Sequence, residues 1–165
     1  MAGRIRRVTP KRVLLVEPDR AIGRRLQRAC APAGRVTLSP EFPTARARLL
    51  AAPPDVLVTN LRLGEYNGLH LLMLIKTSSI PVRCVIVHTD RPDAYLIREA
   101  QKAGAFYETT ARLPYAISSY LQATLPSRDR RNAARYDRRV RGRGGRRAAD
   151  QAPPAWRADQ PQQAR

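Results

Sequence analysis

Few residues of this 165-residue sequence have the types and spacing that catalysis requires. The two histidines, His70 and His88, are too far apart to indicate a metal site or a catalytic triad. Cys30 and Cys84 lie in apolar surroundings without CxxC or Cys/His spacing, so we expect two reduced thiols in or near the core. The glycine-rich segment at 142–145 follows no predicted strand and is therefore not a phosphate loop. The remaining candidates are polar side chains at the ends of apolar runs.

Asn60 is the most informative of these polar side chains. It ends the apolar run Val56–Thr59, while Glu17 and Asp19 follow another apolar run, Val13–Val16. A buried strand thus delivers an uncharged amide to a loop of the kind that faces ligands. A carboxamide is nearly isosteric with a carboxylate, but it is neutral and its nitrogen is a poor nucleophile. Asn60 can therefore make contacts but cannot attack a substrate.

The elements that position these residues alternate between short apolar runs and helical patterns. Strands are predicted at 13–16, 35–38, 56–59, 82–87 and 105–107. Helices are predicted at 20–31, 44–51, 69–76, 94–103 and 114–125 from apolar spacing and from Pro and Gly at their ends. This alternation is typical of a parallel sheet with helices on both faces. Ligands of such sheets bind beyond the carboxyl ends of the strands, where Asn60 falls.

Five segments resemble, in order, the receiver domains of two-component response regulators. VLLVEPDR at 13–20 is similar to the first strand with its acidic turn, PDVLVTN at 54–60 to the strand that carries the phosphoacceptor, and NGL at 67–69 to the turn that follows. IPVRCVIVHT at 80–89 is similar to the strand that ends in a switch Ser/Thr, and AGAFYE at 103–108 to the fifth strand. The resemblance covers residues 12–125. It implies an α/β flavodoxin-like, three-layer sandwich whose five parallel strands have the order 2-1-3-4-5.

The resemblance also implies a chemistry against which the sequence can be compared. In that family an aspartate attacks a phosphoryl group, two acids help to hold Mg²⁺, and a Ser/Thr hydroxyl bonds to the phosphate. Asn60 occupies the position of the aspartate, which makes it a degenerate phosphoacceptor position. Glu17 matches the first acid, Pro18 falls on the second, and Asp19 follows one residue late. The switch hydroxyl is present as Thr89.

The family's phosphate-binding lysine and switch aromatic are matched less well. The lysine position falls at Thr110 or Ala111, and Arg112 is a candidate replacement for the counter-charge. Tyr107 lies near the position of the switch aromatic, where plain packing is an equal alternative. The chain therefore lacks the nucleophile, the lysine and half of the metal site.

We expect this pocket to be inactive in phosphotransfer, with no catalytic residue, no cofactor and at most weak Mg²⁺ binding at Glu17 and Asp19. The alternative is a pocket that uses another acceptor, Asp19 or Asp90. Asp90 is more simply expected to cap the helix at 94–103.

The function implied by the resemblance is that of a stand-alone degenerate receiver domain in bacterial two-component, or phosphorelay, signalling. It would act as a phosphorylation-independent protein–protein interaction module and not as an enzyme. The expected partner is a histidine kinase or another two-component protein, and a homodimer through the same face is an alternative. The candidate contacts on the face made by the fourth helix, fifth strand and fifth helix are Tyr95, Arg98, Lys102, Tyr107 and Tyr115.

The net charge of +18 is distributed unevenly. A basic arm at 1–11 precedes the receiver-like region, and a tail at 126–165 contains twelve Arg and four Asp but few apolar residues. Such a segment cannot bury enough apolar surface to fold, so we expect it to be disordered. Arginine clusters separated by Gly neutralise phosphates without reading sequence. The candidate residues are Arg138, Arg139, Arg141, Arg143, Arg146 and Arg147.

A second possible function, from another class, is therefore that of a nucleic-acid-associated regulatory protein that binds DNA or RNA non-specifically through this tail. A solvated extension without function is the simpler alternative. The apolar runs are too short for a signal peptide or a membrane helix, and we expect a cytoplasmic protein.

Overall fold

A computed structural model describes residues 10–122 of the chain. Its main sheet is parallel and contains β1 (Lys11–Val16), β2 (Gly34–Ser39), β3 (Val56–Asn60), β6 (Cys84–Thr89) and β7 (Phe106–Thr109) in the order β2-β1-β3-β6-β7. Counted along the chain without the two short strands β4 and β5, this is the predicted order 2-1-3-4-5. The predicted three-layer α/β fold is confirmed.

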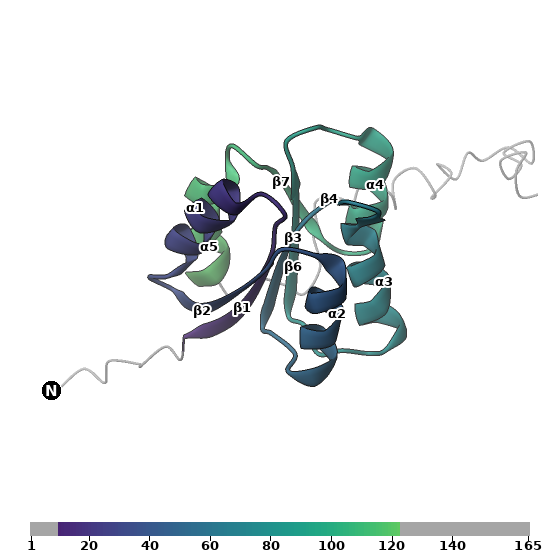
Figure 1. The fold of residues 1–165 in the computed structure, drawn as a ribbon, viewed down its shortest axis with the longest axis horizontal. Coiled ribbons are helices and arrows are strands. Elements are labelled where there is room, and N and C mark those ends of the chain that lie inside the picture. The colour runs from purple at the N-terminus through teal and green to yellow at the C-terminus, as the bar shows by residue number, and fades with distance from the viewer. Residues whose placement is uncertain (1–9, 123–165) are drawn as a thin grey trace, which may run out of the picture. The chain divides into compact units, whose positions relative to one another are not determined.

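The helices cover both faces of this sheet (Figure 1). The helices α1 (Arg20–Cys30) and α5 (Leu113–Gln122) lie on one face, and α2 (Phe42–Ala51), α3 (Gly68–Thr77) and α4 (Ala94–Lys102) lie on the other. Side chains of β1 show why both faces are apolar. Val13 and Leu15 belong to the core cluster that includes α1 and α5, whereas Leu14 and Val16 belong to the cluster that includes α2 and α3. Successive strand residues point to opposite faces, so a strand covered on both sides is continuously apolar.

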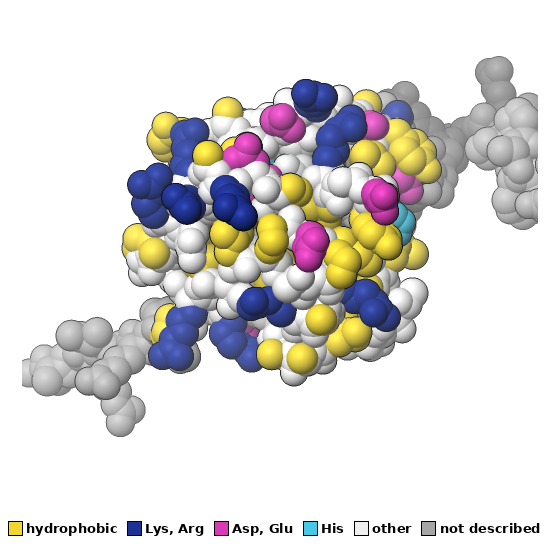
Figure 2. All heavy atoms as spheres, in the orientation of Figure 1, with side chains coloured by type: hydrophobic (Ala, Val, Ile, Leu, Met, Phe, Trp, Pro, Cys, Tyr) yellow, Lys and Arg dark blue, Asp and Glu magenta, His cyan; other side chains and the backbone are white. Residues whose placement is uncertain are grey.

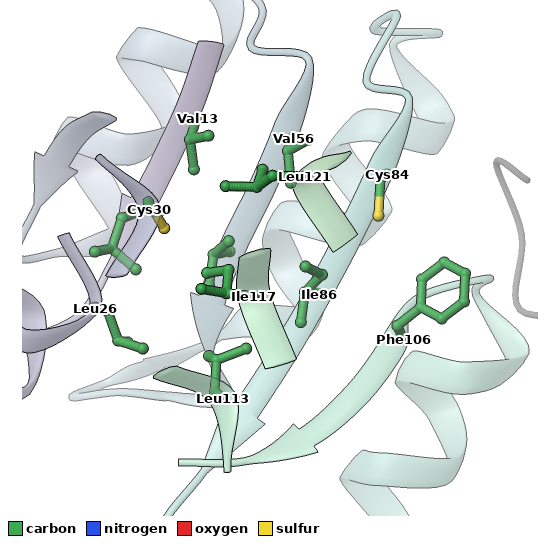
Figure 3. Packing of buried hydrophobic residues seen from close by; sticks show 12 residues of the cluster. Val13, Leu26, Cys30, Val56, Cys84, Ile86, Phe106, Leu113, Ile117 and Leu121 are labelled. Carbon is green, nitrogen blue, oxygen red and sulfur yellow. The ribbon is translucent and has the colours of Figure 1, made fainter. Parts of the chain in front are cut away.

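The core under α1 and α5 contains side chains from all five strands of the main sheet. Leu113, Ile117 and Leu121 recur at helical spacing along α5 and point toward the sheet residues, among them Val56 and Ile86 (Figure 3). Burying a side chain of this size stabilises the fold by about 1.5–3 kcal/mol. Cys30 and Cys84 are both buried free thiols, as predicted, and burial raises the pKa of Cys30 to about 12 and that of Cys84 to about 11.

Several predicted boundaries differ from the structure. The helix predicted at 44–51 begins at Phe42, because Pro43 is tolerated in the first turn of a helix. The strand predicted at 82–87 occupies Cys84–Thr89 instead, and the one predicted at 105–107 continues to Thr109. The predicted arm at 1–11 overlaps the sheet, since β1 begins at Lys11. The last residues of the helix predicted at 114–125 lie outside the described residues.

Two features were not predicted from the sequence. A short antiparallel ribbon of β4 (Arg62–Leu63) and β5 (Tyr66–Asn67) joins β3 to α3, and its turn passes through Gly64 at φ +73°. The helix α4 is capped by Asp93, whose carboxylate accepts hydrogen bonds from the backbone N–H groups of Tyr95 and Leu96 at 3.0 and 3.1 Å. The prediction that Asp90 caps this helix is therefore wrong. The residue that directly precedes the first helical turn is better placed to reach its free N–H groups.

Candidate functional site

Polar residues lie at the carboxyl ends of four neighbouring strands, which meet along one end of the sheet. Glu17 follows β1, Asn60 ends β3, His88 precedes the last residue of β6, and Thr110 follows β7. In the parallel pairing of β3 with β6, Asn60 lies directly opposite His88. The carboxyl ends of these strands thus bring together residues that are far apart in the sequence. We call Glu17, Asn60, His88 and Thr110 the polar network.

Asn60 is held by both ends of its amide. Its Nδ2 donates to Oε2 of Glu17 at 3.0 Å, and its Oδ1 accepts from the backbone N–H of Arg62 at 2.9 Å. Only 6% of Asn60 is exposed. The nitrogen lone pair of an amide is delocalised, so this group is a donor and not a nucleophile. Asn60 thus joins the end of β3 to the end of β1 and to the β4–β5 ribbon.

The two acidic residues near this edge have different roles. Glu17 is buried, and its Oε1 accepts from the backbone N–H of Asp19 at 2.9 Å. Burial raises the pKa of Glu17, an effect that the hydrogen bonds from Asp19 and Asn60 partly offset. Asp19 is exposed, and its Oδ1 accepts from the backbone N–H groups of Ala21 and Ile22 at 2.7 and 3.0 Å. Asp19 is therefore the N-cap of α1.

These contacts do not fit a Mg²⁺ site. Mg²⁺ requires near-octahedral oxygen ligands, usually including one or two carboxylates. Asp19 caps its helix, and Oε2 of Glu17 accepts a hydrogen bond from the Asn60 amide. Among residues 10–122, no group of three or more His, Cys, Asp or Glu side chains is arranged to hold a metal ion.

His88 is the member of the network that the sequence reasoning missed. Its ring is fully buried, with Nδ1 3.0 Å from Oγ1 of Thr110 and Nε2 3.4 Å from Oε2 of Glu17. Burial lowers the pKa of His88 to about 4, and the nearby charge of Asp90 opposes this shift only in part. The contact with Glu17 is therefore not an ion pair at neutral pH, although its geometry would suit one. The tautomer that fits has Nε2–H facing Glu17 and Nδ1 accepting from the Thr110 hydroxyl.

A signal for His88 was present in the sequence. It lies one residue before the end of an apolar strand that neighbours the Asn60 strand, and adjacent parallel strands set opposed side chains on the same face. If the two predicted strands had been aligned in parallel by their last residues, Asn60 would have been placed next to His88.

The predicted counter-charge, Arg112, is not part of the polar network. Its side chain is 79% exposed, and its Nε lies 4.0 Å from Oε2 of Glu108. Thr110, one of the two positions where the resemblance puts a lysine, bonds through its hydroxyl to His88 at 3.0 Å. Arg112 therefore does not join the polar network, and the prediction that it supplies the counter-charge is corrected.

The two predicted switch residues are both packed. Thr89 is 1% exposed, and its hydroxyl donates to the backbone carbonyl of Arg91 at 3.1 Å and accepts from its N–H at 3.2 Å. Tyr107 is half-buried on β7 and packs against the apolar cluster that includes Val87 and Ala100. Burial, with a smaller effect of Glu108, raises the pKa of Tyr107. Neither hydroxyl group contacts Asn60.

The predicted docking residues do not all share one face. Tyr95 is 65% exposed on α4. Arg98 is exposed beside it and donates to the Ala94 carbonyl, and Lys102 bonds to Glu99 at 2.7 Å. Tyr115 is also exposed, at 79%, but its hydroxyl lies 3.4 Å from a guanidinium nitrogen of Arg25 on α1. The grouping of Tyr115 with the α4 residues is therefore wrong, because its ring is turned toward α1.

The candidate tail arginines at 138–147 lie outside the described residues. Within residues 10–122, no helix has the length and apolar character needed to cross a membrane.

The sequence and the structure were compared with known proteins. No protein-family model and no curated protein matches the sequence. Among solved structures, the phosphorylated cyanobacterial phytochrome response regulator RcpA is similar, with a TM-score of 0.63, 22% identity and coverage of 71% of this chain and 97% of its own. Chemotaxis protein CheY4 of Vibrio cholerae has a TM-score of 0.62 at 18% identity, over 71% of this chain and 100% of its own.

The signal receiver domain of a LuxO repressor protein from Vibrio parahaemolyticus is also similar. Its TM-score is 0.61 at 19% identity, over 81% of this chain and 99% of its own. The described residues therefore have the fold of response-regulator receiver domains. These identities are low, and the likeness is one of fold.

Proposed function

We propose that this chain is a degenerate receiver domain that serves as a phosphorylation-independent protein–protein interaction module in two-component signalling. The observation that carries the proposal is the bonding of Asn60. At the end of β3, where the family has its nucleophile, an amide donates to Glu17 and accepts from the backbone of Arg62. The nitrogen lone pair of this amide is delocalised into its carbonyl group, so the side chain is too weak a nucleophile to attack phosphorus.

The neighbouring contacts support the same reading. A working receiver needs a ligand that binds one of two conformations more tightly, and phosphorylation supplies that difference. In this chain the lysine position falls at Thr110 or Ala111, the Thr110 hydroxyl bonds to His88, and the Thr89 hydroxyl bonds to the backbone of Arg91. The domain therefore rests in one conformation, and a partner recognises that conformation directly.

The partner is a histidine kinase or another two-component protein, and its docking face is centred on α4. Tyr95 is the most exposed large apolar residue there, with Arg98 beside it. Aromatic residues and arginine dominate the binding energy of interfaces when a partner covers them. A second copy of this chain is the alternative occupant of the same face, which sedimentation of the purified protein would reveal as a dimer that Tyr95→Ala disrupts.

The test is a binding measurement against purified histidine kinases of the same organism, with and without Mg²⁺ and a small phosphodonor. We expect the same Kd in both conditions and at least a tenfold weaker Kd for Tyr95→Ala. Met73→Ala is the matched control, since Met73 is 54% exposed on α3. A Kd that changes on phosphodonor treatment would overturn the proposal, as would equal effects of the two substitutions.

A further inference from the structure

The side of the domain opposite α4 carries a second distinctive surface. α1 (RAIGRRLQRAC) contains four arginines, Arg20, Arg24, Arg25 and Arg28, and all four are exposed. We call these four residues the arginine face. The helix buries only its opposite side, through Gly23, Leu26 and Cys30. In Figure 2, dark-blue Lys and Arg side chains gather over the region where Figure 1 labels α1.

Among residues 10–122, no ion pair compensates the charge of Arg20, Arg24 or Arg28. Neither α1 nor its neighbours β2 (GRVTLS) and α5 (LPYAISSYLQ) contain Asp or Glu. Asp19 lies at the start of α1, but its carboxylate caps the helix backbone. Among the described residues, Arg20, Arg24 and Arg28 make no ion pair with any carboxylate.

The positions of these arginines do not stabilise the helix. Arg20, Arg24 and Arg28 are each four residues apart, so they lie in one row along α1, and like charges at this spacing destabilise a helix. Arg20 also stands in the first turn, where the helix dipole disfavours a positive charge. With a rise of 1.5 Å per residue, successive members are about 6 Å apart. That spacing is of the same order as the distance between successive phosphates of a nucleic-acid strand.

An aromatic side chain lies against Arg25, the member of the arginine face outside this row. Tyr115 of α5 is 79% exposed, and the guanidinium carbon of Arg25 is 5.8 Å from the centre of its ring. Proteins that bind single-stranded nucleic acids combine a row of cationic side chains with exposed aromatic rings. The phosphate backbone follows the cations, and a base stacks on the ring. The even spacing of the arginines favours a repeating phosphate backbone as the ligand over the irregularly placed carboxylates of an acidic protein.

We propose that the arginine face and Tyr115 form a binding surface for single-stranded nucleic acid on the folded domain itself. The surface is distinct from the basic tail and from the docking face on α4, and it does not depend on the proposed function.

The experiment measures binding of the full chain to a fluorescein-labelled single-stranded pyrimidine 15-mer across a range of salt concentrations. The test variant is Arg20→Gln/Arg24→Gln/Arg28→Gln. The matched control is Arg46→Gln/Arg48→Gln/Arg83→Gln, which removes the same charge from exposed arginines elsewhere on the domain. Because the two variants have the same net charge and the same tail, general attraction weakens equally in both.

We expect the test variant to bind at least tenfold more weakly at 0.1 M salt, and the slope of log K against log salt to fall by about 2, as expected for three lost phosphate contacts. The control should change by less than twofold. Tyr115→Ala should weaken binding about fivefold or more through lost stacking, whereas Tyr95→Ala should not. The melting temperature of the test variant should be unchanged or higher, which separates loss of binding from loss of folding.

Equal losses in the two triple variants would overturn the proposal, because binding would then follow net charge alone. Polyglutamate that competes as well as the unlabelled 15-mer would also overturn it and would assign the face to acidic proteins.

Discussion

Replacing Asn60 by aspartate puts a carboxylate at the end of β3, and the structure predicts that this substitution destabilises the chain. The amide Nδ2 now donates to Oε2 of Glu17 at 3.0 Å in a buried site. A carboxylate there would face a second carboxylate at the same distance. The substitution thus exchanges a hydrogen bond for a repulsion.

The magnitude follows from two limits. Two unit charges 3.0 Å apart repel by about 5 kcal/mol at an effective dielectric constant of 20. Protonating a carboxyl of ordinary pKa, about 4, at pH 7 costs about 4 kcal/mol, so one proton binds before the full repulsion develops. We therefore expect Asn60→Asp to lower the free energy of unfolding by about 2–4 kcal/mol at pH 7. At pH 5 the proton costs only about 1.4 kcal/mol, and the loss should shrink accordingly.

The assay is urea unfolding of the wild type and of Asn60→Asp at pH 7, 6 and 5. Asn60→Ala is the control, since it removes the same hydrogen bonds without adding charge, and its loss of stability should depend on pH less steeply than that of Asn60→Asp. The reasoning would be refuted if Asn60→Asp were as stable as the wild type at pH 7, or if its loss of stability did not diminish at lower pH.

Three further predictions concern the same edge of the sheet. The pKa of His88 falls from 6.5 to about 4 on folding, so the unfolded chain takes up the proton first as the pH is lowered. The free energy of unfolding should therefore drop by up to about 3 kcal/mol between pH 6.5 and about 4. The raised pKa of Glu17 opposes part of this drop, and His88→Gln should flatten the curve of stability against pH. Thr110→Val removes the hydroxyl that bonds to His88 and should cost about 1 kcal/mol in urea unfolding, whereas an unchanged midpoint would show that the bond is dispensable. Gly68→Ala places a Cβ 2.7 Å from the Asn60 carbonyl oxygen and should lower the free energy of unfolding by about 2 kcal/mol in thermal unfolding. Gly64→Ala should cost less, because its Cβ meets no atom within 4 Å and the only cost is the left-handed φ.

The sequence predicted the fold well because its signals are local and repeated. Short apolar runs such as Val13–Val16 are typical of strands buried on both faces, and alternation with amphipathic helices leaves few topologies. The ends of helices were less predictable where two neighbouring residues could each have been the helix cap. Asp90 and Asp93 are both acids ahead of one helix, and only the backbone path decides which of them caps it.

The site was predicted only in part because its contacts are not local. Asn60 and Glu17 were identified one at a time, each from its place after an apolar run. The hydrogen bond between them depends on the pairing of β1 with β3, and the role of His88 depends on the pairing of β3 with β6. Tyr115 was misplaced for a related reason. Which side of α5 faces α1 depends on how the helix is rotated on the sheet, and helical spacing alone does not fix that rotation.

The central claim is that Asn60 and its partners make the pocket unable to accept a phosphoryl group. The most direct measurement is the intact mass of the full chain after incubation with Mg²⁺ and acetyl phosphate, beside a receiver domain that has an aspartate at this position. We predict an unchanged mass for the wild type and also for Asn60→Asp, because neither gains a lysine or a second metal-binding acid. A gain of one phosphoryl group by the wild-type chain would contradict the claim.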